Sequence, residues 1–340
     1  MRAVHIIAGG QFGSEGKGAF TAALTLELKR RFDENPVLVR VAGPNAGHTA
    51  YDAQGRKWSL RQIPVGAVVN LKSAIVIGQQ SEIDLAVIHE EITTLEAAGI
   101  PIMDRLAVDR MATIINMHHV DAERNISTGT TGKGIGGARS GRLLRTADVA
   151  RDIDTGLPLM DTTAVLRMAE EPILIEGTQG YGLGLHTDYY PYVTSSNTRC
   201  GDFLAMTGLQ PWEFQDVFPW VVFRSHPIRI AGNSGPLKDE TTWEEVGQPT
   251  EFTTVTKKPR RVGEWDSTLA HAALRANGAP RCNAVFTFLD YLVPSLAGET
   301  EPTEKLRAAV GMVQELVQYP ISWVGTGPQT GVFRPAGGVW

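Results

Sequence analysis

Residues 9–20, "GGQFGSEGKGAF", combine closely spaced glycines with a serine and a lysine directly behind the apolar run "AVHIIA". Glycines at a strand-to-helix turn let backbone N–H groups approach a phosphate, and the N-terminus of the next helix favours an anion. The segment is not a Walker A loop, because five residues separate Gly10 from Gly16 and Gly18 replaces the magnesium-binding hydroxyl. Lys17 would add a point charge. The turn therefore predicts phosphate binding, with an ordinary strand-to-helix turn as the alternative.

Two further glycine-rich segments have the composition of anion sites. Residues 40–50, "RVAGPNAGHTA", place His48 in a loop behind a strand, and open α/β sheets collect ligands at the carboxyl ends of their strands. An isolated histidine is nevertheless more often structural. Residues 127–145, "STGTTGKGIGGARSGRLLR", combine hydroxyls and glycines with Lys133, Arg139, Arg142 and Arg145. This composition is typical of an anion site or of a solvated loop.

Three later segments carry other hydrogen-bonding groups. Residues 176–202 begin "EGTQG" and continue into a Ser/Thr/Asn run, which suits recognition of a base, a sugar or a phosphate. Residues 253–266, "TTVTKKPRRVGEWD", hold four cations in five positions, broken only by Pro259. They suit a small dicarboxylate, or simply a solvated face. In residues 287–292, "TFLDYL", an aspartate follows an apolar strand and can accept from the N–H groups of guanine.

The elements that must position these loops indicate an α/β fold. Apolar runs predict strands at 3–8, 37–42, 74–78, 172–176, 219–224, 283–289 and 320–324, and helical patterns predict helices at 17–32, 83–98 and 303–318. Continuous apolar strands between helices favour a central, mostly parallel sheet that is covered on both faces. We expect a single domain, residues 1–340, with long loop insertions.

Local signals and bulk composition add further expectations. Ser81 is the predicted cap of helix 83–98, with Asp84 completing a capping box, and residues 230–262 read as a mobile surface loop. The net charge of -5 and the lack of any long apolar run argue against a nucleic-acid or membrane partner. The two cysteines have no metal-ligand spacing and suit a cytoplasmic protein.

Taken together, the motifs resemble the adenylosuccinate synthetase family along nearly the whole chain. The matching stretches are "QFGSEGKG", "GPNAGHT", "GTTGKGIG", "EGTQG", "YPYVTSSNT", "KKPRRVG" and "FLD", in the family's order. The length is similar to the short archaeal form. The resemblance implies a P-loop-NTPase-like fold, Mg2+, and a homodimer whose sites are completed across the interface. It also implies a reaction in which a triphosphate phosphorylates the 6-oxygen of a purine nucleotide and the amine of L-aspartate then displaces phosphate.

The resemblance also implies roles for individual residues. Catalytic roles fall to Ser14, Lys17, His48 and Gln179, and magnesium contacts to Ser14 and the Gly47 carbonyl. The implied monophosphate ligands are Ser14, Asn45, Thr130, Thr131, Gln179, Thr194 and, from the partner subunit, Arg145. The implied triphosphate ligands are Gly13, Glu15, Gly16, Lys17, Gly18, Gly47, His48, Thr49, Phe288, Asp290, Gly325 and Gly327. The implied aspartate ligands are Thr254, Val255, Thr256, Lys258 and Arg260. Lys258 stands where the family usually has arginine, so a bidentate fork is lost there.

Ser14 departs from the family pattern, which has aspartate at this position to take the N1 proton of IMP and help ligate magnesium. A hydroxyl is smaller than a carboxylate, is uncharged at pH 7, and both donates and accepts. It leaves room for a purine 2-amino group and offers that group an acceptor. The departure is similar to a phage branch of the family, which makes N6-succino-2-amino-2'-deoxyadenylate from dGMP and aspartate for diaminopurine DNA. It predicts dGMP as the substrate and, for a phage-borne gene, the host cytoplasm as the location.

Several alternatives stay open at this stage. Phe288 replaces the lysine of the family's guanine-reading segment, and an aromatic ring stacks on any base, so this segment no longer selects GTP. The resemblance to the phage branch implies ATP or dATP as donor, and the retained Asp290 leaves GTP as the alternative. An ordinary synthetase acting on IMP and a non-catalytic nucleotide-binding protein are the competing functions. The sequence identifies neither the group that handles the N1 proton nor a residue that would distinguish ribose from deoxyribose.

Overall fold

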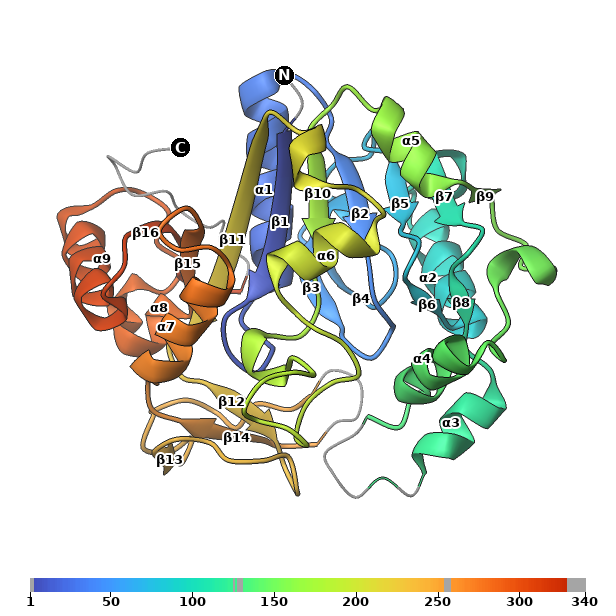
Figure 1. Ribbon diagram of the computed structural model, residues 1–340. Helices are drawn as coiled ribbons and strands as arrows, with labels where there is room; N and C mark the ends of the chain where they lie inside the picture. Colours follow the sequence, from blue (N-terminus) through green and yellow to red (C-terminus); the bar gives the residue numbers. More distant parts are fainter. Residues whose placement is uncertain (1–2, 125, 127–130, 254–257, 329–340) are drawn as a thin grey trace.

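The computed structural model describes residues 3–124, 126, 131–253 and 258–328 (Figure 1). Within them, a nine-stranded sheet has the order β16-β15-β11-β1-β10-β2-β5-β7-β9, and each neighbouring pair is parallel. Its strands are β1 (Ala3–Gly9), β2 (Val37–Arg40), β5 (Ile75–Ile77), β7 (Leu106–Asp109), β9 (Leu159–Met160), β10 (Ile173–Glu176), β11 (Asp216–Arg224), β15 (Asn283–Thr287) and β16 (Ile321–Val324). The predicted α/β fold with a parallel central sheet is confirmed.

Helices cover both faces of this sheet. One face packs against α1 (Lys17–Phe32) and α2 (Leu85–Ala97). The other packs against α5 (Thr162–Met168) and α6 (Cys200–Met206) over its centre, and against α7 (Ser267–Ala276) and α9 (Glu304–Val317) near β16. Helix α1 illustrates why these helices pack on the sheet. Its apolar residues Phe20, Leu24 and Leu28 recur every four residues, and all three are buried against the sheet. Each such side chain contributes about 1.5–3 kcal/mol by burial.

Smaller elements surround the carboxyl ends of the central strands. The sheet β12-β14-β13, below these ends in Figure 1, consists of β12 (Ile228–Ile230), β13 (Glu240–Thr241) and β14 (Arg260–Gly263). The remaining pairs are β3 (His48–Tyr51) with β4 (Lys57–Leu60), and β6 (Glu82–Ile83) with β8 (Thr113–Ile114). Short helices are α3 (Met117–Glu123), α4 (Ile135–Leu144) and α8 (Leu289–Leu292). Single 3-10 turns lie at Val65–Val68, Met103–Arg105, Ala150–Asp152, Tyr181–Leu183, Pro211–Glu213 and Pro294–Leu296.

The seven predicted strands and three predicted helices all occur, with ends that differ by a few residues at most. Two local predictions were wrong. Helix α2 is capped by Asp84, whose side chain accepts from the Val87 N–H, so Ser81 is not the cap. Residues 230–262 are not simply a surface loop, because Arg260–Gly263 pairs with both β12 and β13.

The strand order creates a ligand-binding position at β1. The chain passes from β1 through α1 to β2 on one side, whereas β10 connects to β11 on the other side of β1. Open α/β sheets bind ligands where the order reverses in this way. No helix of the described ranges is both long enough and apolar enough to span a bilayer.

Candidate active site

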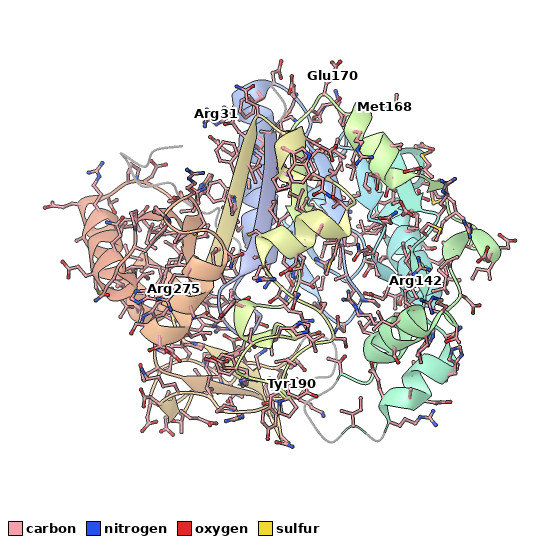
Figure 2. All side chains as sticks on the ribbon, viewed as in Figure 1. Arg31, Arg142, Met168, Glu170, Tyr190 and Arg275 are labelled. Atoms are coloured by element: carbon pink, nitrogen blue, oxygen red, sulfur yellow. The ribbon has the colours of Figure 1, made fainter. Side chains whose placement is uncertain are left out.

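A cavity of about 730 Å³ opens at the carboxyl ends of the central strands. Its walls come from the loops after β1, β2 and β10, from the ends of β15 and β16, and from β12 and β14. The volume falls within the usual range of about 300–1,000 Å³ for ligand pockets. At its rim, Tyr190 is 69% exposed and lies at the lower edge of the molecule (Figure 2).

The structure brings together most of the residues named from the sequence. The cavity wall includes Gly13, Ser14, Glu15, Gly16, Lys17, Gly18, Asn45, Gly47, His48, Thr49, Thr131, Gln179, Thr194, Lys258, Arg260, Phe288, Asp290, Gly325 and Gly327. Arg145 is not on the wall; it is exposed at the C-terminal end of α4. Thr130, Thr254, Val255 and Thr256 lie outside the described residues.

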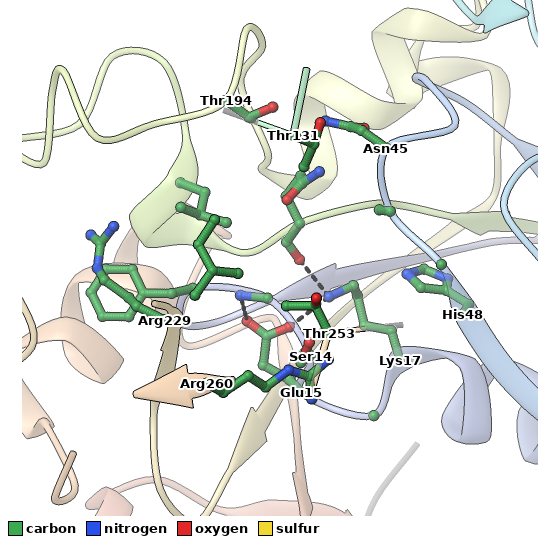
Figure 3. Close-up of a pocket in the computed structure, with 18 of the residues that line it drawn as sticks. Ser14, Glu15, Lys17, Asn45, His48, Thr131, Thr194, Arg229, Thr253 and Arg260 are labelled. Carbon is green, nitrogen blue, oxygen red and sulfur yellow. Dashed lines mark hydrogen bonds and ion pairs between the residues drawn. The ribbon is translucent and has the colours of Figure 1, made fainter. Parts of the chain in front are cut away.

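The turn after β1 is organised around a buried carboxylate (Figure 3). Glu15 Oε1 accepts from the backbone N–H groups of Gln11 (3.1 Å) and Gly13 (2.7 Å). The Lys17 ammonium lies 2.6 Å from Glu15 Oε2 and also donates to the carbonyl of Gln179. Lys17 thus brings its charge to the turn as one half of an ion pair with Glu15. Glu15 neutralises it and uses two of the turn's N–H donors.

Ser14 lies at the tip of this turn with a left-handed backbone, φ 58°. Its carbonyl accepts from Arg224 Nη1 at 3.3 Å, which fixes the turn against the end of β11. No described residue forms a hydrogen bond with its hydroxyl, and the residue lines the cavity. The hydroxyl is thus available to a bound molecule as both donor and acceptor.

His48 is held by a buried ion pair behind the cavity wall. Glu176 Oε1 lies 2.5 Å from His48 Nδ1 and 2.6 Å from Arg40 Nη1, while Glu176 Oε2 accepts from the Val65 N–H. Arg40 Nη1 also lies 2.8 Å from His48 Nδ1. The ionised Glu176 carboxylate can only accept and is the nearer partner, so we assign the Nδ1 proton to the bond with Glu176, which leaves the lone pair of the neutral imidazole at Nε2. Glu176 therefore sets both the tautomer and the orientation of a ring that lines the cavity.

The same environment decides the charge of His48. Burial is the main cause that lowers its pKa to about 4; the Arg40 charge lowers it further, and the Glu176 charge opposes both. The ring is therefore neutral at pH 7 before any ligand binds. An anionic group placed beside it would favour the imidazolium, which can donate from Nε2.

On the cavity wall, Phe288 forms an aromatic platform. Its backbone is left-handed, φ 56°, the Arg224 guanidinium lies 4.1 Å from its ring centroid, and the Tyr291 ring meets it edge-on at 5.0 Å. Nearby, Asp290 Oδ1 is buried without a hydrogen-bond partner among the described residues, and burial raises the pKa of this carboxyl. This part of the wall thus offers a ring for stacking and a carboxylate for an N–H donor.

Sequence reasoning missed three groups that support these residues. Arg40 and Arg224 are fully buried at the ends of β2 and β11, and Glu251 pairs with Arg224. A signal was present for the two arginines, because each is a charged residue within or at the end of an apolar strand run. Glu251, in a polar loop, gave no such signal.

The oxygen donors present fit a magnesium ion that also binds phosphate. Among the described residues, no group of three or more His, Cys, Asp or Glu side chains is placed to hold a metal ion. Ser14 and the carbonyl-bearing loop at Gly47 both line the cavity and offer neutral oxygen. Mg2+ usually keeps several waters and takes other ligands from substrate phosphates, so it does not need an all-protein cage.

Comparison with known proteins gives concordant results. The model of the adenylosuccinate synthetase family matches residues 6–155 and 157–294. The adenylosuccinate synthetases of Thermococcus onnurineus (strain NA1) and Archaeoglobus fulgidus are each 34% identical, over 96% and 95% of both chains respectively. The structure of cyanophage S-2L succinoaminodeoxyadenylate synthetase (PurZ), bound to dGMP and to dATP as an energy donor, has a TM-score of 0.82 at 26% identity and covers 98% of this chain and 95% of its own. Fully ligated adenylosuccinate synthetase from Plasmodium falciparum, 20% identical with a TM-score of 0.77 over 97% of this chain and 99% of its own, shares the fold.

Proposed function

The chain belongs to the adenylosuccinate synthetase family of C–N ligases, and we propose that its purine substrate is dGMP, which it converts with L-aspartate to N6-succino-2-amino-2'-deoxyadenylate. The observation that carries this proposal is Ser14. Its hydroxyl lines the cavity, has no partner among the described residues, and replaces the carboxylate that other members place beside the purine. A dGMP-bound relative with the same fold supports the assignment.

The chemistry follows from the arrangement of the cavity. The 6-oxygen attacks the γ-phosphorus of the triphosphate, the diphosphate leaves, and the purine loses its N1 proton. The amine of aspartate then attacks C6, phosphate leaves with the 6-oxygen, and the new C–N bond is complete once the amine has lost a proton. His48 donates a hydrogen bond from Nε2 to the transferring group once the phosphate charge favours its protonation. Magnesium, held by Ser14, Gly47 and substrate phosphates, would neutralise the charge on the phosphoryl group.

The other ligand roles follow the walls of the cavity. Asn45, Thr131, Gln179 and Thr194 surround the proposed monophosphate position, and Lys258 and Arg260 the proposed aspartate position. The proposed triphosphate position lies along Gly13, Gly16, Gly18 and Thr49 towards Gly325 and Gly327. The proposal also includes Thr130 as a monophosphate ligand, and Thr254, Val255 and Thr256 as aspartate ligands.

We infer that the phosphoryl donor is ATP or dATP. Phe288 presents a ring backed by the Arg224 guanidinium, and stacking on a ring accepts any base. The Oδ1 atom of Asp290 is buried, has no hydrogen-bond partner in the part of the chain that the structure describes, and can accept from the exocyclic amine of adenine. The same oxygen suits the N–H groups of guanine, so GTP is the alternative donor.

A homodimer completes the proposal. Arg145 is exposed and lies off the cavity wall, as a residue that acts on the site of another subunit should. The two residues before it, Leu143 and Leu144, are 80% and 70% exposed, so the end of α4 presents apolar surface beside the cation. Burial of such a patch favours association. The proposed location is the cytoplasm, that of the host for a phage-borne gene.

A phosphate-release panel tests the proposal directly. The wild-type protein is assayed with L-aspartate and Mg2+, crossing dGMP, GMP and IMP with ATP, dATP and GTP. We expect aspartate-dependent phosphate release with dGMP and little with IMP. Turnover with IMP alone would establish the ordinary synthetase, which the 34% identical relatives favour. Nucleotide binding without phosphate release in any combination would indicate a non-catalytic protein.

A further inference from the structure

Glu251 joins two arginines, Arg260 on the cavity wall and Arg224 behind it. Its Oε1 lies 2.6 Å from Arg224 Nη2, and its Oε2 lies 2.6 Å from Arg260 Nη1. Tyr291 donates its hydroxyl to the same carboxylate at 3.0 Å. Glu251 is not on the cavity wall, whereas Arg260 and Tyr291 are. The carboxylate therefore acts on residues that can touch a ligand without touching one itself.

The contact with Glu251 leaves one edge of Arg260 unoccupied. Only Nη1 of this guanidinium bonds to Glu251, while Nε is buried and has no partner among the described residues. Nε and Nη2 form the side of the guanidinium that grips a carboxylate with two parallel hydrogen bonds. The side chain is only 13% exposed and lines the cavity. Within the described ranges, Nε is covered by protein atoms and is an unsatisfied donor, and a bound carboxylate is the group that would satisfy this edge.

Arg224 extends the connection towards the rest of the site. Its guanidinium lies over the Phe288 ring and donates to the Ser14 carbonyl at 3.3 Å. Two guanidinium groups held this close repel each other unless a negative charge separates them. Burial alone would raise the pKa of the Glu251 carboxyl, but the charges and hydrogen bonds of Arg224 and Arg260 outweigh burial and lower that pKa to about 2. The carboxylate is ionised throughout the working range.

We propose that Glu251 is a positioning residue for the amine substrate: by holding Nη1 of Arg260, it presents the Nε–Nη2 edge to a carboxylate of aspartate. This inference rests on the proposed ligase function. It also explains how the site can bind a carboxylate although lysine replaces the family's usual arginine at position 258. Lys258 lacks a fork and is exposed. The Nε and Nη2 atoms of Arg261 are bonded to Glu240, and Arg261 lies off the cavity wall, so Arg260 is the described arginine of this segment whose fork can face a ligand.

The first test is Glu251→Gln, with Glu240→Gln as the matched control. Glu240 pairs with Arg261, the next residue of β14, through bonds of 2.7 and 2.5 Å, and lies off the cavity wall. We expect Glu251→Gln to raise KM for L-aspartate about ten- to hundredfold, the loss typical of a charge-assisted hydrogen bond, with KM for the monophosphate changed less than about twofold. Glu240→Gln should leave both constants at wild-type values. Equal rises in both KM values in Glu251→Gln would overturn the proposal, since general loosening affects all substrates.

A double-mutant cycle shows whether Glu251 acts through Arg260. Arg260→Lys keeps the charge and removes the fork, so it should raise KM for aspartate by itself. In that background Glu251→Gln should add less than about twofold, because the two residues form one unit. A full, multiplicative effect in the double variant would refute the proposal.

The assay separates this proposal from the identity of the purine. Both variants are measured with whichever monophosphate the wild type uses, so a preference for IMP overturns the dGMP assignment and leaves the Glu251 comparison intact. If no monophosphate supports turnover, calorimetric titration with succinate, a dicarboxylate without the amine, gives the same comparison. Weaker succinate binding in Glu251→Gln than in Glu240→Gln supports the positioning role, and equal binding refutes it.

Discussion

Replacing Glu176 by glutamine tests the network that holds His48. The carboxylate receives three donors: His48 Nδ1 and Arg40 Nη1 at one oxygen, and the Val65 N–H at the other. Glutamine has nearly the same shape but only one acceptor oxygen. In one orientation the amide oxygen accepts from Arg40 and His48, and the amide NH2 then faces the Val65 N–H, donor against donor. In the other orientation the oxygen accepts from the Val65 N–H, and the NH2 then faces the Arg40 and His48 donors.

The magnitude follows from the burial of the groups. Arg40 and Glu176 are each 1% exposed, and loss of one partner from a buried ion pair costs about 3–5 kcal/mol. One buried N–H left without an acceptor costs about 1–3 kcal/mol. The two costs share atoms and do not simply add. Arg40 also keeps its bonds to the carbonyls of Ala46 and Arg61. We expect the free energy of unfolding to fall by about 3–5 kcal/mol.

The measurement is urea unfolding followed by far-UV circular dichroism at pH 7, with Glu27→Gln as the control. Glu27 forms an i,i+3 pair with Arg30 on the surface of α1, and its loss should have a far smaller effect. A second readout is the phosphate-release rate, which should fall because the His48 ring is no longer fixed in one tautomer. A Glu176→Gln protein with wild-type stability and wild-type turnover would show that the buried pair neither stabilises the fold nor orients His48 for the reaction.

Three further predictions concern other parts of the chain. Ser14→Asp should weaken use of dGMP and restore some use of IMP, by as much as about 10⁴-fold in their ratio, and an unchanged preference in the phosphate-release panel would rule out Ser14 as the selector. Gly18→Ala would place a Cβ 2.6 Å from the Thr49 carbonyl oxygen and should markedly lower the melting temperature. Its control is Gly201→Ala, whose Cβ would have no atom within 4 Å and which should raise the free energy of unfolding by about 0.5–1 kcal/mol. Burial, then the Arg31 charge, lowers the pKa of His5 to about 3, so the unfolded chain binds a proton below about pH 6.5 while the folded protein does not. Stability present above pH 6.5 should therefore fall by about 1.4 kcal/mol per pH unit towards pH 3, and His5→Asn should flatten that slope in urea titrations.

The sequence was most informative where one signal dominated. The strands of the central sheet are continuous apolar runs, and residues such as Ile6, Val39 and Ile175 are fully buried or nearly so. Because burial on both faces requires such runs, these strands could be predicted from the sequence. Glycine-rich loops directly behind those strands located the cavity, because parallel strands deliver their carboxyl ends to one edge.

What could not be predicted depends on long-range pairing. Glu15 and Lys17 were predicted as separate ligands, but they pair with each other within the turn. The bond of Lys17 to the Gln179 carbonyl arises only when β1 and β10 lie side by side. Arg260 was predicted as an aspartate ligand through the family resemblance, because its segment alone suits a solvated face equally well. The pairing of β14 with β12 is what brings it to the cavity. The assignment of caps failed at Asp84 for a smaller reason: two residues with capping side chains lie three positions apart, and only the backbone decides which one begins the helix.

The left-handed backbone of Ser14 restricts which amino acids this position can explore. β-Branched residues are strained there, while glycine and short polar residues such as asparagine and aspartate tolerate it. A saturation library at this codon should therefore yield few well-folded, active clones. The survivors should come from a small set of amino acids. Under the proposed role of Ser14 as the purine selector, one or two nucleotide changes within this set would exchange one purine preference for the other, so the evolutionary distance between the two specificities would be short.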